Sequence, residues 1–171
     1  MRSFWRGLVT TVATGAAAAG PVPVGDLLPL GFQLVNRNSD KCLAVTADGL
    51  DDNAILIQRQ CTTAYRWRFT PVAGTGLYQV RNVTSGRCLT IVGDSLEDNG
   101  FAVQYRCTDD PSQRWRIRRD GGLLDTDALL ENARSHKCLT IAGGSAAENG
   151  VAVQYHCDAE LSRRWRLPLA V

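Results

Sequence analysis

Short apolar or β-branched runs, separated by Gly, Asn, Asp or Ser, recur along the chain after residue 30. Residues 78–80, 88–91 and 101–105 are three such runs. Runs of this length between turn-forming residues are typical of β-strands. The same part of the chain has no convincing 3.6-residue periodicity, so no amphipathic helix is predicted there. The pattern therefore indicates an all-β fold.

The strand pattern occurs in three similar copies. Each copy has two cysteines 19 residues apart, an Asn six residues before the first cysteine, a Leu directly after it, and a Gln in one shared register. The members are Asn36, Cys42, Leu43, Gln58 and Cys61, then Asn82, Cys88, Leu89, Gln104 and Cys107, then Asn132, Cys138, Leu139, Gln154 and Cys157. Such self-similarity predicts three equivalent units, over about 32–69, 78–117 and 128–167. We call them units one, two and three.

Each unit contains a turn between its cysteines and closes with Arg-Trp-Arg. Asn and Gly tolerate positive φ, so the turns predict hairpins. In a strand, the closing alternation directs Trp to one face and both arginines to the other, which predicts a buried Trp. The turns are Asp52-Asn53-Ala54, Asp98-Asn99-Gly100 and Glu148-Asn149-Gly150, and the closing triplets are centred on Trp67, Trp115 and Trp165.

About four short strands per unit cannot bury a hydrophobic face alone. Three such units around a pseudo-threefold axis can close a barrel and protect their strand edges. The length of 171 residues and the 44% hydrophobic content are enough for one ordinary core. One all-β domain with internal threefold symmetry is therefore predicted, over 32–171.

The amino-terminal residues are typical of a secretory leader. Arg2 and Arg6 precede an apolar stretch and the small-residue run at 16–20, which predicts a signal peptide over 1–19 and a linker over 20–31. A retained Ala-rich tail is the alternative. Removing the leader would take the basic count from 19 to 17, equal to the 17 acidic residues, so the net charge selects no charged partner. No stretch reaches the ~20 apolar residues of a membrane span.

Six cysteines in a small, exported chain favour disulfides over metal or redox chemistry. Six cysteines allow fifteen connectivities. Closing each pair within its own unit satisfies the threefold repeat most simply. The predicted bonds are Cys42–Cys61, Cys88–Cys107 and Cys138–Cys157.

The combination of Cys-Leu, an Asn-Gly turn, Val-Gln-Tyr-x-Cys and a closing Gln-x-Trp resembles the ricin B-type lectin repeat. The resemblance covers residues 32–167, and residues 88–117 match best. It implies a β-trefoil with pseudo-threefold symmetry that binds galactose-like or xylan-type sugars in up to three shallow pockets. It implies no metal and no cofactor.

The resemblance also implies where the sugar would bind. The family carries a carboxylate two residues after the first cysteine, and here Ala44, Thr90 and Thr140 occupy that position. It carries an aromatic two residues before the second cysteine, matched by Tyr105 and Tyr155 but not by Arg59, and an Asn-Gln pair before the closing Trp, matched only by Gln113. Unit two therefore retains most of a pocket. Asp94 or Asn99 is predicted to supply the missing acceptor there, with Asn149 in the analogous place of unit three. For the two Asn residues, a plain role in the turn is the favoured alternative.

Other functions have less support in the sequence. The repeated arginines could dock an anionic polymer, or they could be solvated side chains paired with nearby acids. Nucleic-acid binding would require a basic patch with exposed stacking aromatics, whereas the recurring Trp is predicted inside. The chain has two histidines and no recognisable catalytic motif. The sequence thus predicts a secreted, non-enzymatic glycan-binding module, or alternatively a trefoil that has lost sugar binding and acts as a protein-interaction or inhibitory scaffold.

Overall fold

The computed structural model describes residues 31–119 and 127–170. The predicted leader at 1–19 and nearly all of the linker at 20–31 lie outside the described residues. Within the described ranges, no helix has the length and apolarity needed to cross a membrane.

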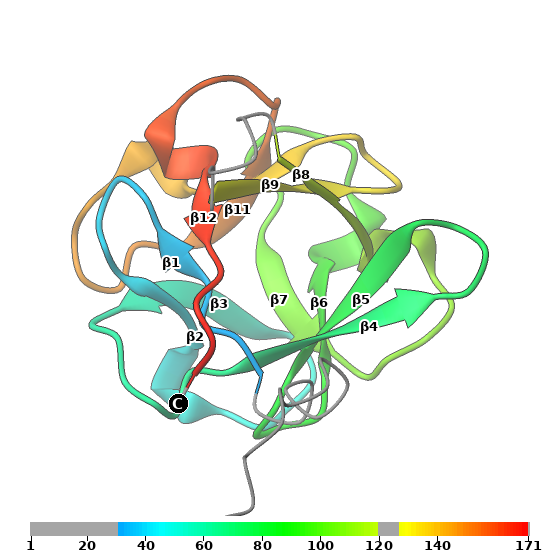
Figure 1. The fold of residues 1–171 in the computed structure, drawn as a ribbon, viewed down its shortest axis with the longest axis horizontal. Coiled ribbons are helices and arrows are strands. Elements are labelled where there is room, and N and C mark those ends of the chain that lie inside the picture. The colour runs from blue at the N-terminus through cyan, green and yellow to red at the C-terminus, as the bar shows by residue number, and fades with distance from the viewer. Residues whose placement is uncertain (1–30, 120–126, 171) are drawn as a thin grey trace, which may run out of the picture.

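Each unit contributes four strands. Unit one contains β1 (Val35–Asn36), β2 (Cys42–Val45), β3 (Ala54–Arg59) and β4 (Trp67–Val72). Unit two contains β5 (Leu77–Asn82), β6 (Cys88–Ile91), β7 (Ala102–Tyr105) and β8 (Arg114–Arg118), and unit three contains β9 (Asp127–Asn132), β10 (Cys138–Ile141), β11 (Ala152–Tyr155) and β12 (Trp165–Arg166). Short 3-10 turns lie between strands: η1 (Thr46–Asp48), η2 (Val92–Asp94), η3 (Pro111–Gln113), η4 (Ala142–Gly144) and η5 (Leu161–Arg163). In Figure 1 the colour runs from blue through cyan to green over unit one, from green to yellow-green over unit two, and from yellow to red over unit three.

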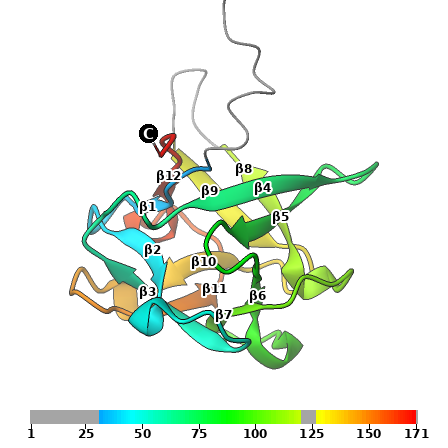
Figure 2. The same ribbon diagram turned by 90° about the horizontal axis from the view of Figure 1, so that it is seen from below.

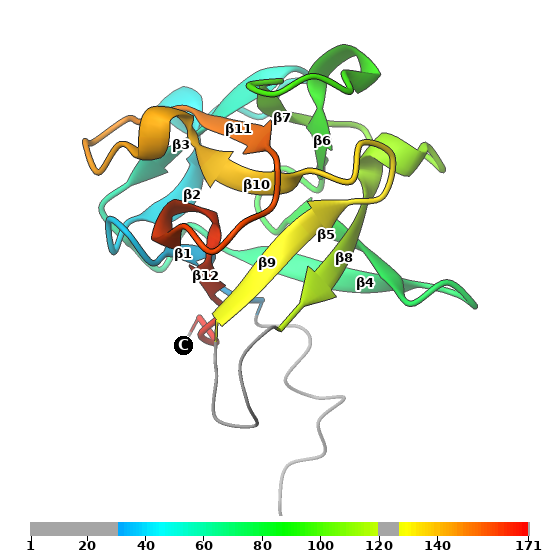
Figure 3. The same cartoon turned by 90° about the horizontal axis from the view of Figure 1, so that it is seen from above.

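The first and last strands of each unit form a barrel. Antiparallel pairing runs from β1 to β12, β9, β8, β5 and β4. Reciprocal backbone hydrogen bonds of 2.8 Å between Phe32 and Trp67 close the ring beside β1. The middle strands form the hairpins β2–β3, β6–β7 and β10–β11, which lie on one side of the barrel strands (Figures 2 and 3).

The three hairpins also pair with one another. Strand β3 pairs with β7 through Ile55 and Val103, and isolated bridges join Ile57 to Val151 and Phe101 to Val153. These contacts cover strand edges that would otherwise be free to pair with other chains. The all-β, β-trefoil architecture with three similar units is confirmed.

Three tryptophans occupy the core at equivalent positions. Trp67, Trp115 and Trp165 are fully buried. Their indole Nε1–H groups donate to the carbonyls of Leu43, Leu89 and Leu139 at 3.0, 3.0 and 2.9 Å. The prediction that the Arg-Trp-Arg alternation places Trp inside is confirmed.

A buried glutamine ties each hairpin to the unit that precedes it around the pseudo-threefold axis. Gln104 of unit two donates from Nε2 to the carbonyls of Gly49 and Asp51 in unit one, at 2.9 and 3.0 Å, and its Oε1 accepts the hydroxyl proton of Ser85 at 2.8 Å. Gln58 and Gln154 make the same bonds to units three and two. These side chains therefore brace the backbone between repeats.

The predicted disulfide pairing is confirmed. Cys42–Cys61, Cys88–Cys107 and Cys138–Cys157 each close a loop within one unit, and no cysteine is free. In each unit the bond joins the start of the hairpin to the segment that follows it.

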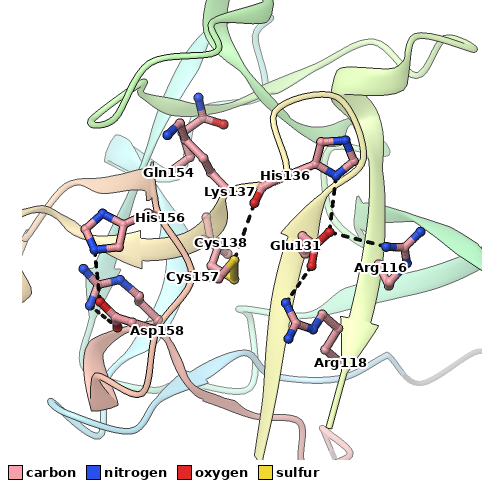
Figure 4. The surroundings of a disulfide bond; sticks show 12 residues. Arg116, Arg118, Glu131, His136, Lys137, Cys138, Gln154, His156, Cys157 and Asp158 are labelled. Atoms are coloured by element: carbon pink, nitrogen blue, oxygen red, sulfur yellow. Dashed lines mark hydrogen bonds and ion pairs between the residues drawn. A yellow bond between two sulfur atoms is a disulfide. The ribbon is translucent and has the colours of Figure 1, made fainter. Parts of the chain in front are cut away.

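Several of the repeated arginines pair with acids. Glu131 is nearly buried and receives Arg116 at 3.4 Å and Arg118 at 2.8 Å, with His136 Nδ1 at 3.5 Å (Figure 4). Arg166 pairs with Asp40 of unit one. These partners reduce the positive charge that the arginines could offer to an anionic polymer.

Candidate functional site

Two open pockets lie on the outer faces of the second and third hairpins. Pocket two has a volume of about 440 Å³ and pocket three about 480 Å³. Pocket two is lined by Asn53, Thr90, Ile91, Val92, Gly93, Asp94, Val103, Tyr105, Thr108, Asp110, Ser112 and Gln113. Pocket three is lined by Asn99, Thr140, Ile141, Gly143, Gly144, Val153, Tyr155, Asp158, Glu160, Ser162 and Arg163.

Tyr105 supplies the aromatic side of pocket two. It ends strand β7 and is half-buried, and the guanidinium carbon of Arg106 lies 5.2 Å from its ring centroid. Thr90 lies on β6 with its hydroxyl 2.9 Å from Ser112 Oγ in the buried wall. The Thr90 hydroxyl is therefore already engaged and does not replace the family's carboxylate.

Two carboxylates supply the acceptor side of pocket two. Asp94 ends the η2 turn at φ 52°, and its side chain has no hydrogen-bond or ion-pair partner among residues 31–119 and 127–170. Asp110 caps η3 by accepting a hydrogen bond from the Ser112 N–H at 2.8 Å. The backbone and hydroxyl hydrogen bonds of Ser112 lower the pKa of Asp110 below its ordinary 3.8. Asp110 is therefore ionised at neutral pH, and the carboxylate oxygens of both residues can accept hydrogen bonds from hydroxyl groups.

Acid is expected to disrupt this pocket through Asp110. A carboxyl whose folded-state pKa is lowered stabilises the fold above its ordinary pKa, and that contribution is lost as the pH falls through the lowered value. The η3 cap should therefore persist through pH 3.8 and fail below it. Carbon-detected NMR titration of the Asp110 carboxyl, with the Ser112 amide as reporter, measures this step. Asp110→Asn should remove the step from the Ser112 amide, and a titration midpoint above 3.8 would contradict the assignment.

Gln113 has a supporting role. It is buried, its Oε1 accepts the Thr108 N–H at 2.7 Å, and its Nε2 donates to the Arg106 carbonyl at 2.9 Å. These bonds hold the loop that carries Thr108 and Asp110. Gln113 is thus a positioning residue whose amide is already engaged.

Pocket three has a different polar lining. Arg163 replaces the glutamine, is nearly buried, pairs with Asp158 at 2.7 Å, and places its guanidinium carbon 4.9 Å from the Tyr155 ring centroid. His156 Nε2 lies 3.2 Å from the same Asp158 (Figure 4). The Thr140 hydroxyl donates to the Ser162 carbonyl at 2.9 Å. Pocket three keeps an aromatic ring, but one of its carboxylates is already occupied.

The place in unit one that is equivalent to pockets two and three has a different lining. Ala44 and Arg59 replace the polar and aromatic residues, and Arg59 lies 6.0 Å from the Tyr65 ring centroid and 3.7 Å from Asp48. The cavity beside Tyr65 measures only about 80 Å³. The sequence-based expectation that unit one matches the family least agrees with this geometry.

The structure places the turn asparagines differently from the prediction. Asn99 lines pocket three rather than pocket two, and Asn149 lines neither pocket. Their backbone N–H groups donate to the Gln154 and Gln58 carbonyls of neighbouring units, at 2.8 and 2.9 Å, so each turn packs against the next hairpin. By the same rule Asn53 of unit one reaches pocket two.

Sequence reasoning missed Asp110 and Asn53. The signal for Asp110 was available, because Asp-Pro-Ser is a typical start of a helical turn, with the acid as cap and Pro at the first position. Asn53 had no local signal, since its place depends on how the units pack together.

Fold and pockets together define a class of protein. A β-trefoil whose hairpins carry shallow, polar pockets with a tyrosine at one side is built like the sugar-binding trefoils. Residues 63–155 match the ricin-type beta-trefoil lectin domain-like family, and the chain belongs to that family.

Solved structures share the fold. The designed threefold-symmetric protein ThreeFoil is 27% identical with a TM-score of 0.75, over 80% of this chain and 96% of that protein. The exo-beta-1,3-galactanase 1,3Gal43A from Clostridium thermocellum is 27% identical with a TM-score of 0.76, over 81% of this chain but only 30% of the enzyme. The Rhizoctonia solani agglutinin is 16% identical with a TM-score of 0.70, over 87% of this chain and 99% of the agglutinin. No curated protein sequence matches the chain.

Proposed function

We propose that the protein is a secreted, non-enzymatic carbohydrate-binding module that holds neutral glycans weakly, mainly in pocket two and secondarily in pocket three. The main support is that the carboxyl residues Asp94 and Asp110 line the same pocket as Tyr105. An ionised acceptor suits vicinal sugar hydroxyls, and an aromatic face suits the apolar side of a sugar ring. Three disulfides and the predicted leader support export.

The galactanase match covers only part of the enzyme. This chain spans 30% of that enzyme's chain, so the enzyme's activity does not transfer to it. Lectins are also among the similar structures, including one from Polyporus squamosus that was solved with a sialylated glycan, at 18% identity. These neighbours are consistent with a sugar-binding trefoil, and the particular sugar is open to test.

A glycan array with the purified protein and three single-residue variants tests the proposal. Tyr105→Ala should weaken binding about tenfold, because aromatic packing is worth up to about 1.5 kcal/mol. Asp94→Asn should weaken glycan binding more than Tyr105→Ala does. It should leave folding unchanged, because the Asp94 side chain has no partner among the described residues. Tyr155→Ala should have a smaller effect, since pocket three is secondary.

The array also separates the alternative functions. Silence on neutral and acidic glycans would contradict sugar binding and favour the protein-interaction scaffold. Retention on anionic polymers that falls steeply with salt, and that ignores Tyr105→Ala, would instead favour the arginine surface.

A further inference from the structure

An exposed phenylalanine lies on the ridge between the two pockets. Phe101 directly precedes β7 and is 49% exposed, which is unusual for a large aromatic in a folded domain. The core does not use its side chain, whereas the next residue, Ala102, belongs to the core cluster. Because side chains alternate across a strand, Phe101 points to the outer face of the hairpin.

The outer face at Phe101 is shared with residues of both pockets. Within its own hairpin, the Phe101 carbonyl accepts the N–H of Val92, which lines pocket two and is 38% exposed. Across the unit boundary, Phe101 forms an antiparallel bridge with Val153, which lines pocket three. Directly opposed residues have Cβ atoms about 5 Å apart on the same face. The ring therefore lies between the apolar margins of the two pockets.

The equivalent positions in the other units differ. Ile55 pairs with Val103 at the boundary of units one and two, and Val151 pairs with Ile57 at the boundary of units three and one. Only unit two places an aromatic ring at this position. It also places it at the boundary that has an open pocket on both sides.

We infer that Phe101 is an additional stacking platform that extends the glycan-binding face beyond the pockets, and that the ligand is an oligosaccharide or polysaccharide chain rather than a single terminal sugar. One sugar ring is held by Tyr105 and the carboxylates of pocket two. In a longer glycan, the sugar units that follow this ring lie over the apolar surface of Val92 and Phe101. An exposed aromatic gains contact area with a sugar ring at low conformational cost. This inference rests on the proposed glycan binding.

Calorimetry with sugar ladders tests the inference on the intact protein. The probes are galactose and xylose, with β-1,3-galactan and xylan oligosaccharides of increasing length. For wild type, affinity should rise with chain length on at least one ladder. Phe101→Ala should remove about two- to tenfold of the gain for long chains and leave the affinity for the shortest binding member unchanged.

Val151→Ala is the matched control. It truncates the equivalent residue of unit three, which is aliphatic and offers no aromatic face to a sugar ring, so the length dependence should stay as in wild type. Equal length dependence in wild type and Phe101→Ala would overturn the platform while leaving glycan binding intact. If neither the single sugars nor the oligosaccharides of the two ladders bind, both the Phe101 platform and the proposed glycan binding are overturned.

Discussion

Replacing Trp115 with alanine is expected to lower the free energy of unfolding by about 3 to 5 kcal/mol, the range for deleting a fully buried aromatic. Two losses combine at this site. The indole is fully buried in the central core cluster, so its removal leaves a cavity among well-packed neighbours. The Leu89 carbonyl also loses the Nε1–H donor that lies 3.0 Å away. Domains of this kind are stable by only about 5 to 15 kcal/mol, so the variant should be close to unfolding.

Denaturant unfolding monitored by circular dichroism measures the Trp115 effect. Trp67→Ala and Trp165→Ala should fall in the same range, because both indoles are buried and make the same bond to a leucine carbonyl. Thr70→Ala, on the exposed face of β4, should stay within about 0.5 kcal/mol of wild type. A loss below about 1 kcal/mol at Trp115 would mean that the three indoles do not hold the core together.

The fold could be predicted from sequence because its determinants are local and repeated. The cysteine spacing, the turn residues and the Arg-Trp-Arg alternation each depend on a few neighbouring residues, and each occurs three times. An ambiguous assignment in one unit can therefore be resolved from the equivalent residues of the other two units. The disulfides and the buried tryptophans followed from that redundancy.

The pockets were harder to predict because they form between units. The sequence grouped Tyr105 with Asp94, and both residues line pocket two because they belong to the same hairpin. It assigned Asn99 to the wrong pocket, because the turn that carries Asn99 leans onto unit three through the bond from its N–H to the Gln154 carbonyl. Pairing between units is a long-range property that no spacing within one unit encodes.

The same pairing between units gives the second prediction, in which Gln104→Glu lowers the free energy of unfolding by about 3 to 5 kcal/mol at neutral pH. Gln104 is fully buried, and its side-chain Nε2 donates hydrogen bonds to the carbonyls of Gly49 and Asp51. Glutamate has nearly the same shape but brings an oxygen to that place. An ionised carboxylate would then face two carbonyl oxygens without a compensating charge, which is costly in a buried site.

The pH dependence separates this charge effect from a simple loss of shape. Burial and the facing carbonyls disfavour the ionised form, so the pKa of the introduced carboxyl rises in the folded state. A group with a raised folded-state pKa destabilises the fold above that pKa, and the deficit shrinks as the pH falls toward the ordinary value of about 4.3. Gln104→Glu should therefore regain stability relative to wild type on mild acidification, measured as the difference in urea midpoints at each pH.

Gln104→Ala provides the comparison that identifies the cause. It removes the same donor but adds no charge, so its deficit of about 1 to 3 kcal/mol should not follow the titration of a carboxyl. If Glu and Ala cost the same at every pH, the cost lies in the Nε2 donor that both variants lose, and the introduced charge adds nothing. If only Glu recovers in acid, the inter-unit carbonyls of Gly49 and Asp51 require a donor from unit two. The Gln104 Nε2 group also holds the turn that carries Asn53, and Asn53 lines pocket two. Loss of these hydrogen bonds should therefore also loosen that side of the pocket.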